Sequence, residues 1–213
     1  MLIGFLGGTF DPIHKGHLHV AQAILQHLPV DHVRLVLAAR PGHRQQPNTS
    51  IEHRWQMLQL ACDNKRLVAD DIELSRQGPS YTIDTLEQYR AANPDWVPCW
   101  ILGWDAFITL PQWHRWREIV QLCNLVVVKR PASGQDHNSM DGLAPIEIQQ
   151  LCHQHETKTL STTTVGQILR LDIPMLDVSA TQIRTRIRDH EPCEDLLVEP
   201  VNAYIMEHGL YEA

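Results

Sequence analysis

Residues 7–17, which read GGTFDPIHKGH, combine glycines with two histidines in a pattern that suits phosphate binding. Glycines let the backbone approach a ligand closely, and unpaired N–H groups at the start of a helix attract a phosphate. His14 and His17 are three residues apart, so both imidazoles would point the same way in the first turn of a helix. The string predicts a polyphosphate site, and Lys15 is expected to face solvent.

The same residues also fit simpler roles. A glycine pair after a strand is typical of a turn, and two histidines in a first helical turn could be a cap and a solvated neighbour. A metal site of His14, His17 and His19 would lack a carboxylate or cysteine at close helical spacing, so no metal site is predicted. The P-loop pattern and the G-x-G-x-x-G pattern are both missing from the sequence after its first apolar run, which argues against a P-loop enzyme and a hydride transferase.

A second candidate phosphate-binding string, VSATQIR, occupies residues 178–184 near the other end of the chain. Ser179 suits the N-cap of a helix, and Arg184 would lie one turn in, where its guanidinium could bind a phosphate. The alternative is an ordinary solvated arginine on a helix surface.

The elements that must position these strings alternate along the chain. Short apolar runs predict strands at residues 2–6, 33–37, 99–102, 125–128, 168–171 and 175–178. Helical spacing predicts helices at residues 16–27, 51–61, 81–91, 116–122, 180–188 and about 200–208. This alternation is typical of an α/β fold with a parallel sheet and crossover helices, in which ligands bind at the carboxyl ends of the strands.

Length and composition predict one globular domain. The 213 residues are expected to form a single unit over 1–213, with 179–213 as a C-terminal helical part packed on it. Residues 132–142, rich in Ser, Gly, Asp and Asn, are expected to form a surface loop.

Charge, hydropathy and cysteine usage exclude several classes of protein. A net charge of −7 removes the basic field that non-specific nucleic-acid binding needs. The longest aliphatic run, residues 35–39, is far short of a membrane span, and the N-terminus lacks the pattern of a cleaved export signal. Five dispersed cysteines without a Cys-x-x-Cys pair suit reduced thiols, so a cytoplasmic protein without nucleic-acid or membrane partners is expected.

Both strings resemble known signatures. Residues 7–17, with the core HKGH, resemble the H/T-x-G-H signature of a nucleotidyltransferase superfamily, and residues 178–184 are similar to its I-S-x-T-x-x-R segment. The middle of the chain resembles the bacterial nicotinate-nucleotide adenylyltransferases over nearly the whole length. That resemblance is carried by PSYT at 79–82, GWD at 103–105, LPQWH at 110–114 and RP at 130–131.

The resemblance implies a Rossmann-like, doubly wound, mainly parallel sheet with a small C-terminal helical extension. It also implies transfer of the adenylyl group of ATP to nicotinate mononucleotide, giving nicotinate adenine dinucleotide and pyrophosphate, with Mg²⁺ accompanying ATP. The enzyme is expected to be a monomer or a small homo-oligomer. Its catalytic residues would be His14, His17 and Arg184.

The binding residues implied by the resemblance fall into two groups. Those expected to contact ATP are Gly7, Gly8, Thr9, Phe10, His17, Gly103, Asp105, Arg130, Ser179, Thr181 and Arg184. Those expected to contact the mononucleotide are His43, Arg44, Tyr81, Thr82, Asp105, Trp113 and His114. Within the second group, Trp113 would stack on the pyridine ring and the Thr82 backbone would bind the nicotinate carboxylate. For Asp105, a helix cap is the alternative role.

One loop departs from the family pattern. Residues 37–44 read LAARPGHR, where family members commonly have P-N-x-x-P-P-H-K/R, so Ala38 replaces an asparagine and Gly42 a proline. Arg40 is a hypothetical substitute for the lost phosphate contact.

Three other functions fit parts of the sequence. An adenylyltransferase acting on another phosphate, such as a phosphopantetheine, would share both signatures but lack the 80–82 and Trp113 elements. A class I aminoacyl-tRNA synthetase remnant would share the histidine motif, but the net charge and the lack of a K-M-S-K-S string argue against it. A catalytically silent nucleotide sensor is disfavoured by the intact histidines and Arg184.

Overall fold

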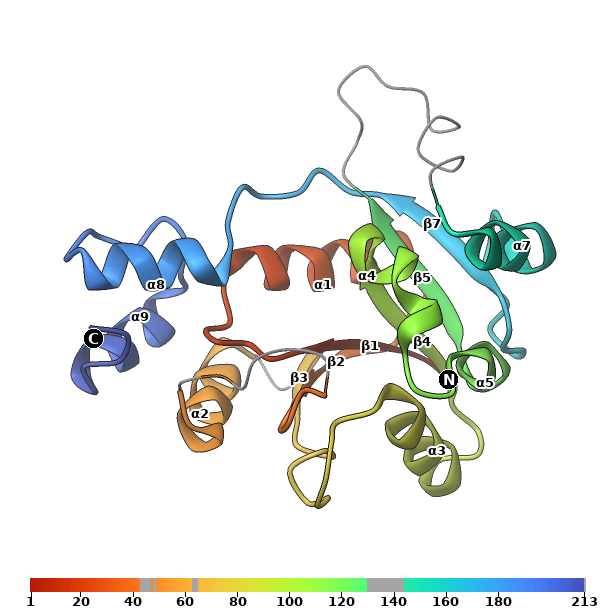
Figure 1. Ribbon diagram of the computed structural model, residues 1–213, viewed down its shortest axis with the longest axis horizontal. Coiled ribbons are helices and arrows are strands. Elements are labelled where there is room, and N and C mark those ends of the chain that lie inside the picture. The colour runs from red at the N-terminus through yellow and green to blue at the C-terminus, as the bar shows by residue number, and fades with distance from the viewer. Residues whose placement is uncertain (43–46, 48, 63–64, 130–143, 213) are drawn as a thin grey trace.

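Seven parallel strands form one sheet in the order β3-β2-β1-β4-β5-β7-β6 (Figure 1). The computed structural model describes residues 1–42, 47, 49–62, 65–129 and 144–212. In these ranges the strands are β1 (Leu2–Gly8), β2 (His32–Leu37), β3 (Leu67–Asp70), β4 (Val97–Gly103), β5 (Asn124–Lys129), β6 (Glu156–Thr157) and β7 (Ile168–Asp172). The predicted α/β fold is confirmed.

Helices cover both faces of this sheet. They are α1 (Lys15–His27), α2 (Ile51–Ala61), α3 (Thr82–Ala92), α4 (Trp104–Ile108), α5 (Trp116–Leu122), α7 (Ile146–His155), α8 (Ala180–Arg188) and α9 (Glu199–Glu207), with a 3₁₀ turn η1 (Leu110–Gln112). None of them, within the described ranges, is both long and apolar enough to span a bilayer.

Successive side chains of β1 pack into two separate hydrophobic cores, one on each face of the sheet. Leu2 and Leu6 join a core packed by α1, α2, α8 and α9, whereas Ile3 and Phe5 join a core packed by α3, α4, α5 and α7. Alternation sends successive strand residues to opposite faces, so both faces of a central strand are buried. In Figure 1, α8 and α9 lie at one end of the molecule and α7 lies at the other.

The C-terminal residues share a core with the N-terminal ones. Ile183 and Val201 are fully buried in the same cluster as Leu2 and Leu35, and α9 packs against α2. Because apolar burial is the main stabilising contribution to folding, removal of α8 and α9 would expose the apolar side chains of this cluster that they cover.

Two sequence predictions for local structure are wrong. Residues 7–8 were expected to turn after the first strand, but β1 runs through Gly8 and pairs with β2 as far as Leu37. Residues 175–178 do not form a strand: Pro174 offers no N–H for a ladder, and Met175 and Leu176 are 36% and 42% exposed. The segment leads from β7 into α8.

Several elements had no clear signal in the sequence. The edge strand β3 is only four residues long and ends in Asp70, a buried carboxylate that accepts hydrogen bonds from Arg34 and Tyr89. Strand β6, helix α7 and the short α4 were also not predicted. The loop expected at 132–142 lies outside the described residues. All five cysteines lie in the described ranges, and none of them is in a disulfide.

Candidate active site

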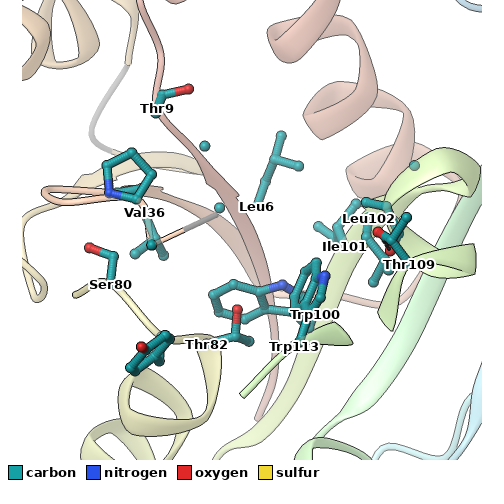
Figure 2. A pocket seen from close by; sticks show the side chains of 18 of the residues that line it. Leu6, Thr9, Val36, Ser80, Thr82, Trp100, Ile101, Leu102, Thr109 and Trp113 are labelled. Carbon is teal, nitrogen blue, oxygen red and sulfur yellow. Dashed lines mark hydrogen bonds between the residues drawn. The ribbon is translucent and has the colours of Figure 1, made fainter. Parts of the chain in front are cut away.

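A cavity of about 530 Å³ opens at the carboxyl ends of β1 and β4 (Figure 2). The chain leaves β1 toward β2 on one side, while β4 flanks β1 on the other, so the direction of winding reverses between β1 and β4. Ligands of open α/β sheets bind at such a switch point. Gly7, Gly8 and Thr9 line the cavity from β1, and Gly103 lines it from β4.

The two glycines that end β1 are needed for close packing rather than for a turn. A Cβ on Gly7 would lie 2.9 Å from the Trp100 ring, and a Cβ on Gly8 would lie 2.8 Å from the Phe10 ring. Phe10 itself makes the turn, with a left-handed φ of 47°. Its buried ring then meets His17 edge-on, with 5.0 Å between ring centroids. The Phe10 side chain therefore supports His17, and the expected ATP contact of Phe10 would have to come from its backbone.

His14 and His17 form a stacked pair at the start of α1. Their ring centroids lie 3.7 Å apart with 25° between planes, which confirms that both imidazoles point the same way. His14 is the N-cap residue, and its backbone N–H donates to Nδ1 of His17 over 3.3 Å. In a neutral imidazole one nitrogen accepts while the other carries the proton. The proton of neutral His17 therefore lies on Nε2.

Burial keeps this pair uncharged. It lowers the pKa of His14 to about 4, and it lowers the pKa of His17 well below the usual value, with a further decrease from the neighbouring His14. At neutral pH the free protein therefore presents neutral imidazoles at the helix start. Nδ1 of His14 is buried and has no hydrogen-bond partner among the described residues, which leaves a polar atom for a ligand to satisfy.

His14 should make stability depend on pH. The unfolded state binds a proton near pH 6.5 and the folded state only near pH 4, so stability rises with pH across that window and is fully present above it. We expect His14→Asn, which retains a capping side chain, to reduce this slope by up to about 1.4 kcal/mol per pH unit. Urea unfolding between pH 4 and 7 measures how the free energy of unfolding changes with pH. His27→Asn, at the other end of α1, is the control. An unchanged slope in His14→Asn would contradict the shifted pKa.

The two signature strings meet at this site. Arg184 in α8 donates from Nη1 to the Asp11 carbonyl over 2.7 Å and from Nη2 to the Thr181 hydroxyl over 3.2 Å. A Cβ on Gly16 would lie 2.8 Å from a Val178 methyl, so this glycine permits the contact between the strings. Ser179 caps α8 as predicted, accepting from the Gln182 N–H over 3.1 Å.

Lys15 does not simply face solvent, which corrects the sequence prediction. Its ammonium donates to the carbonyls of Glu194 and Asp195 over 2.8 and 3.2 Å, and its backbone N–H donates to Leu196 over 3.0 Å. Near the chain end, the Tyr211 hydroxyl donates to the Asp11 carboxylate over 2.7 Å. The C-terminal part therefore binds the loop before α1 at several points.

The predicted mononucleotide residues line the other side of the cavity. Tyr81 and His114 stack with 4.5 Å between ring centroids, and Trp113 is half-buried in the same wall (Figure 2). Thr82 is the first residue of α3, so its N–H belongs to the helix start, where backbone donors lack intrahelical acceptors. Asp105 is exposed in the first turn of α4, whose N-cap is Gly103, so Asp105 is not the helix cap.

Three predicted site residues, His43, Arg44 and Arg130, lie outside the described residues. The neighbouring loop is described as far as Gly42, and Ala38 lines the cavity. Arg40 is exposed and donates from Nη1 to the Arg76 carbonyl over 2.9 Å. Its guanidinium is therefore engaged with the protein, so binding a phosphate in place of the missing asparagine would require this hydrogen bond to be given up.

Sequence patterns missed several residues around the cavity. Trp100, one of six tryptophans, forms part of the cavity wall, and Glu73 is a buried carboxylate there that accepts from the Thr85 hydroxyl over 2.6 Å. Burial raises the pKa of Glu73. Arg54 in α2 binds the loops that end β1 and β2. Trp100 could have been found from strand alternation, because it shares its face of β4 with Leu102.

Comparisons with known proteins agree with this geometry. The model of the cytidylyltransferase-like family matches residues 5–186. A probable nicotinate-nucleotide adenylyltransferase of Hydrogenovibrio crunogenus is 41% identical, covering 99% of this chain and 98% of the relative. A protein of the same name from Pseudomonas fluorescens is 42% identical, covering 99% and 97%.

Solved structures support the fold. The Plasmodium falciparum nicotinic acid mononucleotide adenylyltransferase complexed with NaAD matches with a TM-score of 0.72 and 19% identity, over 99% of this chain and 97% of that one. A putative nicotinate-nucleotide adenylyltransferase from Vibrio parahaemolyticus matches with a TM-score of 0.65 and 14% identity, over 99% and 94%. The family model and the relatives that match over nearly the full length show the family. The chain belongs to the cytidylyltransferase-like family and, within it, to the nicotinate-nucleotide adenylyltransferases.

Proposed function

We propose that this protein transfers the adenylyl group of ATP to nicotinate mononucleotide, forming nicotinate adenine dinucleotide and pyrophosphate in NAD biosynthesis. The observation that carries the proposal is the continuity of the site: one cavity at the β1/β4 switch point joins an aromatic wall to the loop that leads to the histidine pair. Family membership supports the same reaction.

The phosphate of nicotinate mononucleotide is the nucleophile. Its second pKa is about 6, so it is largely dianionic at neutral pH and needs no general base. One of its oxygens attacks the α-phosphorus of ATP in line, a new P–O bond forms, and the bond to the β-phosphate bridging oxygen breaks. The bond electrons leave with pyrophosphate, and no proton transfer is required. The protein must align two anions and stabilise the leaving charge.

Neutral histidines suit this task. His17 would donate Nε2–H to a phosphate oxygen, because its Nδ1 already accepts from the His14 backbone. His14, the N–H groups at the start of α1, and Arg184 would supply further donors. These donors are fixed before the substrate binds, so little reorganisation is needed during reaction.

Mg²⁺ is proposed to enter with ATP. Mg²⁺ keeps several waters and is typically held by substrate phosphates and one or two carboxylates, so a cage made by the protein is not required. Within the described residues no group of three or more His, Cys, Asp or Glu side chains is placed to hold a metal, and Asp105 offers an exposed carboxylate at the cavity. This donor set fits a substrate-borne cation. When bound, Mg²⁺ would neutralise phosphate charge.

The acid should be strongly preferred over its amide. Trp113 would stack on the electron-poor ring, and the Thr82 N–H at the start of α3 would bind the carboxylate. Nicotinamide mononucleotide lacks that charge, so we expect kcat/KM to favour nicotinate mononucleotide by at least about 100-fold. Pyrophosphate release with ATP and a panel of mononucleotides and phosphopantetheine tests this. Equal or faster turnover of another acceptor would contradict the proposed substrate.

The domain organisation, the location in the cell and the assembly of the protein are also proposed. We infer that residues 1–213 act as one domain, since the cores on both faces of the sheet include β1 residues. Free thiols and a net charge of −7 are consistent with a cytoplasmic enzyme that works on small molecules as a monomer or small homo-oligomer.

A further inference from the structure

Arg54 is the largest of the fully buried side chains in the described structure. It lies on α2, is 1% exposed, and does not line the cavity itself. Charged residues are rarely buried to this extent unless they are paired with an opposite charge. Its surroundings therefore indicate a specific use for the guanidinium.

The guanidinium binds backbone carbonyls of three separate segments. Nη1 donates to Thr9 and to Ala38, each over 2.9 Å, and Nη2 donates to Ala39 over 3.1 Å. Nε donates to Thr49 over 3.3 Å. Thr9 follows β1 and Ala38 follows β2, and both line the cavity. One planar side chain thus fixes the two loops against each other.

No salt bridge to Arg54 occurs among the described residues. Burial lowers the pKa of the guanidinium, although an arginine remains protonated at neutral pH, and the more distant Asp11 acts in the opposite direction. Removing an unpaired charge from water costs several kcal/mol, and an apolar side chain of similar volume would fill the space without that cost. The free energy of burying this charge is offset by the carbonyls it binds, by the more distant Asp11 carboxylate and by any anion in the cavity.

We propose that Arg54 is a positioning residue for adenylyl transfer, an inference that rests on the proposed function. By binding three carbonyl oxygens, it turns these acceptors toward itself and sets the loops that approach the phosphates. Its positive charge, buried behind the loops without a salt bridge among the described residues, also attracts the bound anions through a medium that screens poorly. Arg54 does not touch the substrates.

Arg54→Met and Arg54→Lys test this role. Methionine retains volume but loses every donor and the charge, and we expect kcat to fall about 100-fold, with smaller changes in KM, because misplaced loops misalign the reacting groups. Lysine retains the charge but not the planar fork, so kcat should fall about 10-fold while the Tm stays within a few degrees of wild type.

Arg66→Met is the matched control. Arg66 is exposed and also binds backbone carbonyls, those of Leu25 in α1 and of Val30 in the connection to β2, away from the cavity. Its loss should lower the Tm and leave kcat of the folded enzyme within about 2-fold. Rates are measured well below the Tm of each variant, so that a purely structural role would leave kcat unchanged.

Binding of inorganic pyrophosphate, measured by calorimetry, gives a readout that needs no turnover. Arg54→Met should weaken this binding about 10-fold, whereas Arg66→Met should not. If wild type fails to turn over but these affinities differ as stated, the proposed reaction is wrong, while the positioning of the phosphate-binding loops by Arg54 is still supported. If Arg54→Met is folded with wild-type kcat and affinity, the inference is overturned. Should methionine prevent folding, wild-type kcat in Arg54→Lys overturns it equally.

Discussion

Replacing His17 with alanine is expected to lower kcat by about 100-fold or more while the fold remains intact. Neutral His17 carries its proton on Nε2 because Nδ1 accepts from the His14 backbone, so the ring offers a fixed donor to the transferring phosphoryl group. Alanine removes this donor together with the Nδ1 acceptor of the His14 N–H, while the backbone hydrogen bonds from the His17 and Leu18 N–H groups to the His14 carbonyl remain. Steady-state pyrophosphate release measures kcat, and circular dichroism checks the fold.

His27→Ala is the control for His17→Ala, because His27 lies in the last turn of the same helix and bonds only to the Ala23 carbonyl. Its kcat should match that of wild type. A His17→Ala enzyme with near-normal turnover would refute the assignment, whereas a loss confined to KM would indicate uniform binding rather than stabilisation of the transition state.

Replacing Arg184 with alanine should lower kcat/KM by about 100- to 1,000-fold. The Arg184 guanidinium donates to the Asp11 carbonyl and to the Thr181 hydroxyl. Because the guanidinium is planar and rigid, these two hydrogen bonds fix the direction of its remaining N–H donors. Lysine has a single ammonium and cannot bind both anchors and a phosphate in this geometry. Arg184→Lys should therefore recover less than about one tenth of the lost activity.

Arg188 provides the comparison for Arg184 within one helix. It is exposed near the end of α8, beside Asp189, and Arg188→Ala should leave kcat/KM within about 2-fold. If the effect came from the loss of one positive charge on α8, kcat/KM would fall in both alanine variants. If it came from a lost phosphate contact, kcat/KM would fall only in Arg184→Ala. Comparable losses in the two alanine variants would rule out a specific role for Arg184.

The repeating elements of the fold could be predicted because each carries a local signal. The helix at Ile51–Ala61 and the helix at Ala180–Arg188 match their predicted ranges, since apolar spacing and the Ser179 cap mark them along the chain. The paired histidines could be predicted for the same reason, because helical geometry alone orients two side chains that are three residues apart.

Residues defined by distant partners could not be predicted. Arg54 reads as a polar residue on an amphipathic helix, and only the assembled fold shows that its acceptors come from Thr9 and Ala38. Lys15 likewise carries no local sign of its acceptors, which are 179 and 180 residues away in the sequence. The apolar residues 175–178 resemble a strand, but Pro174 and the lack of a pairing partner among the described strands decide otherwise.

The attachment of the last residues to the first loop has a consequence for biosynthesis. Tyr211 binds Asp11, the carbonyls of Glu194 and Asp195 hold Lys15, and Arg184 reaches the same loop. Contacts of such long sequence separation form late, because closing a long loop has an entropic cost that must be met first. During synthesis, the histidine string at residues 14–17 leaves the ribosome before these partners have been made. These supports of the loop before α1 therefore form only after residues 184–211 have been made, and loss of Tyr211 alone removes one of them.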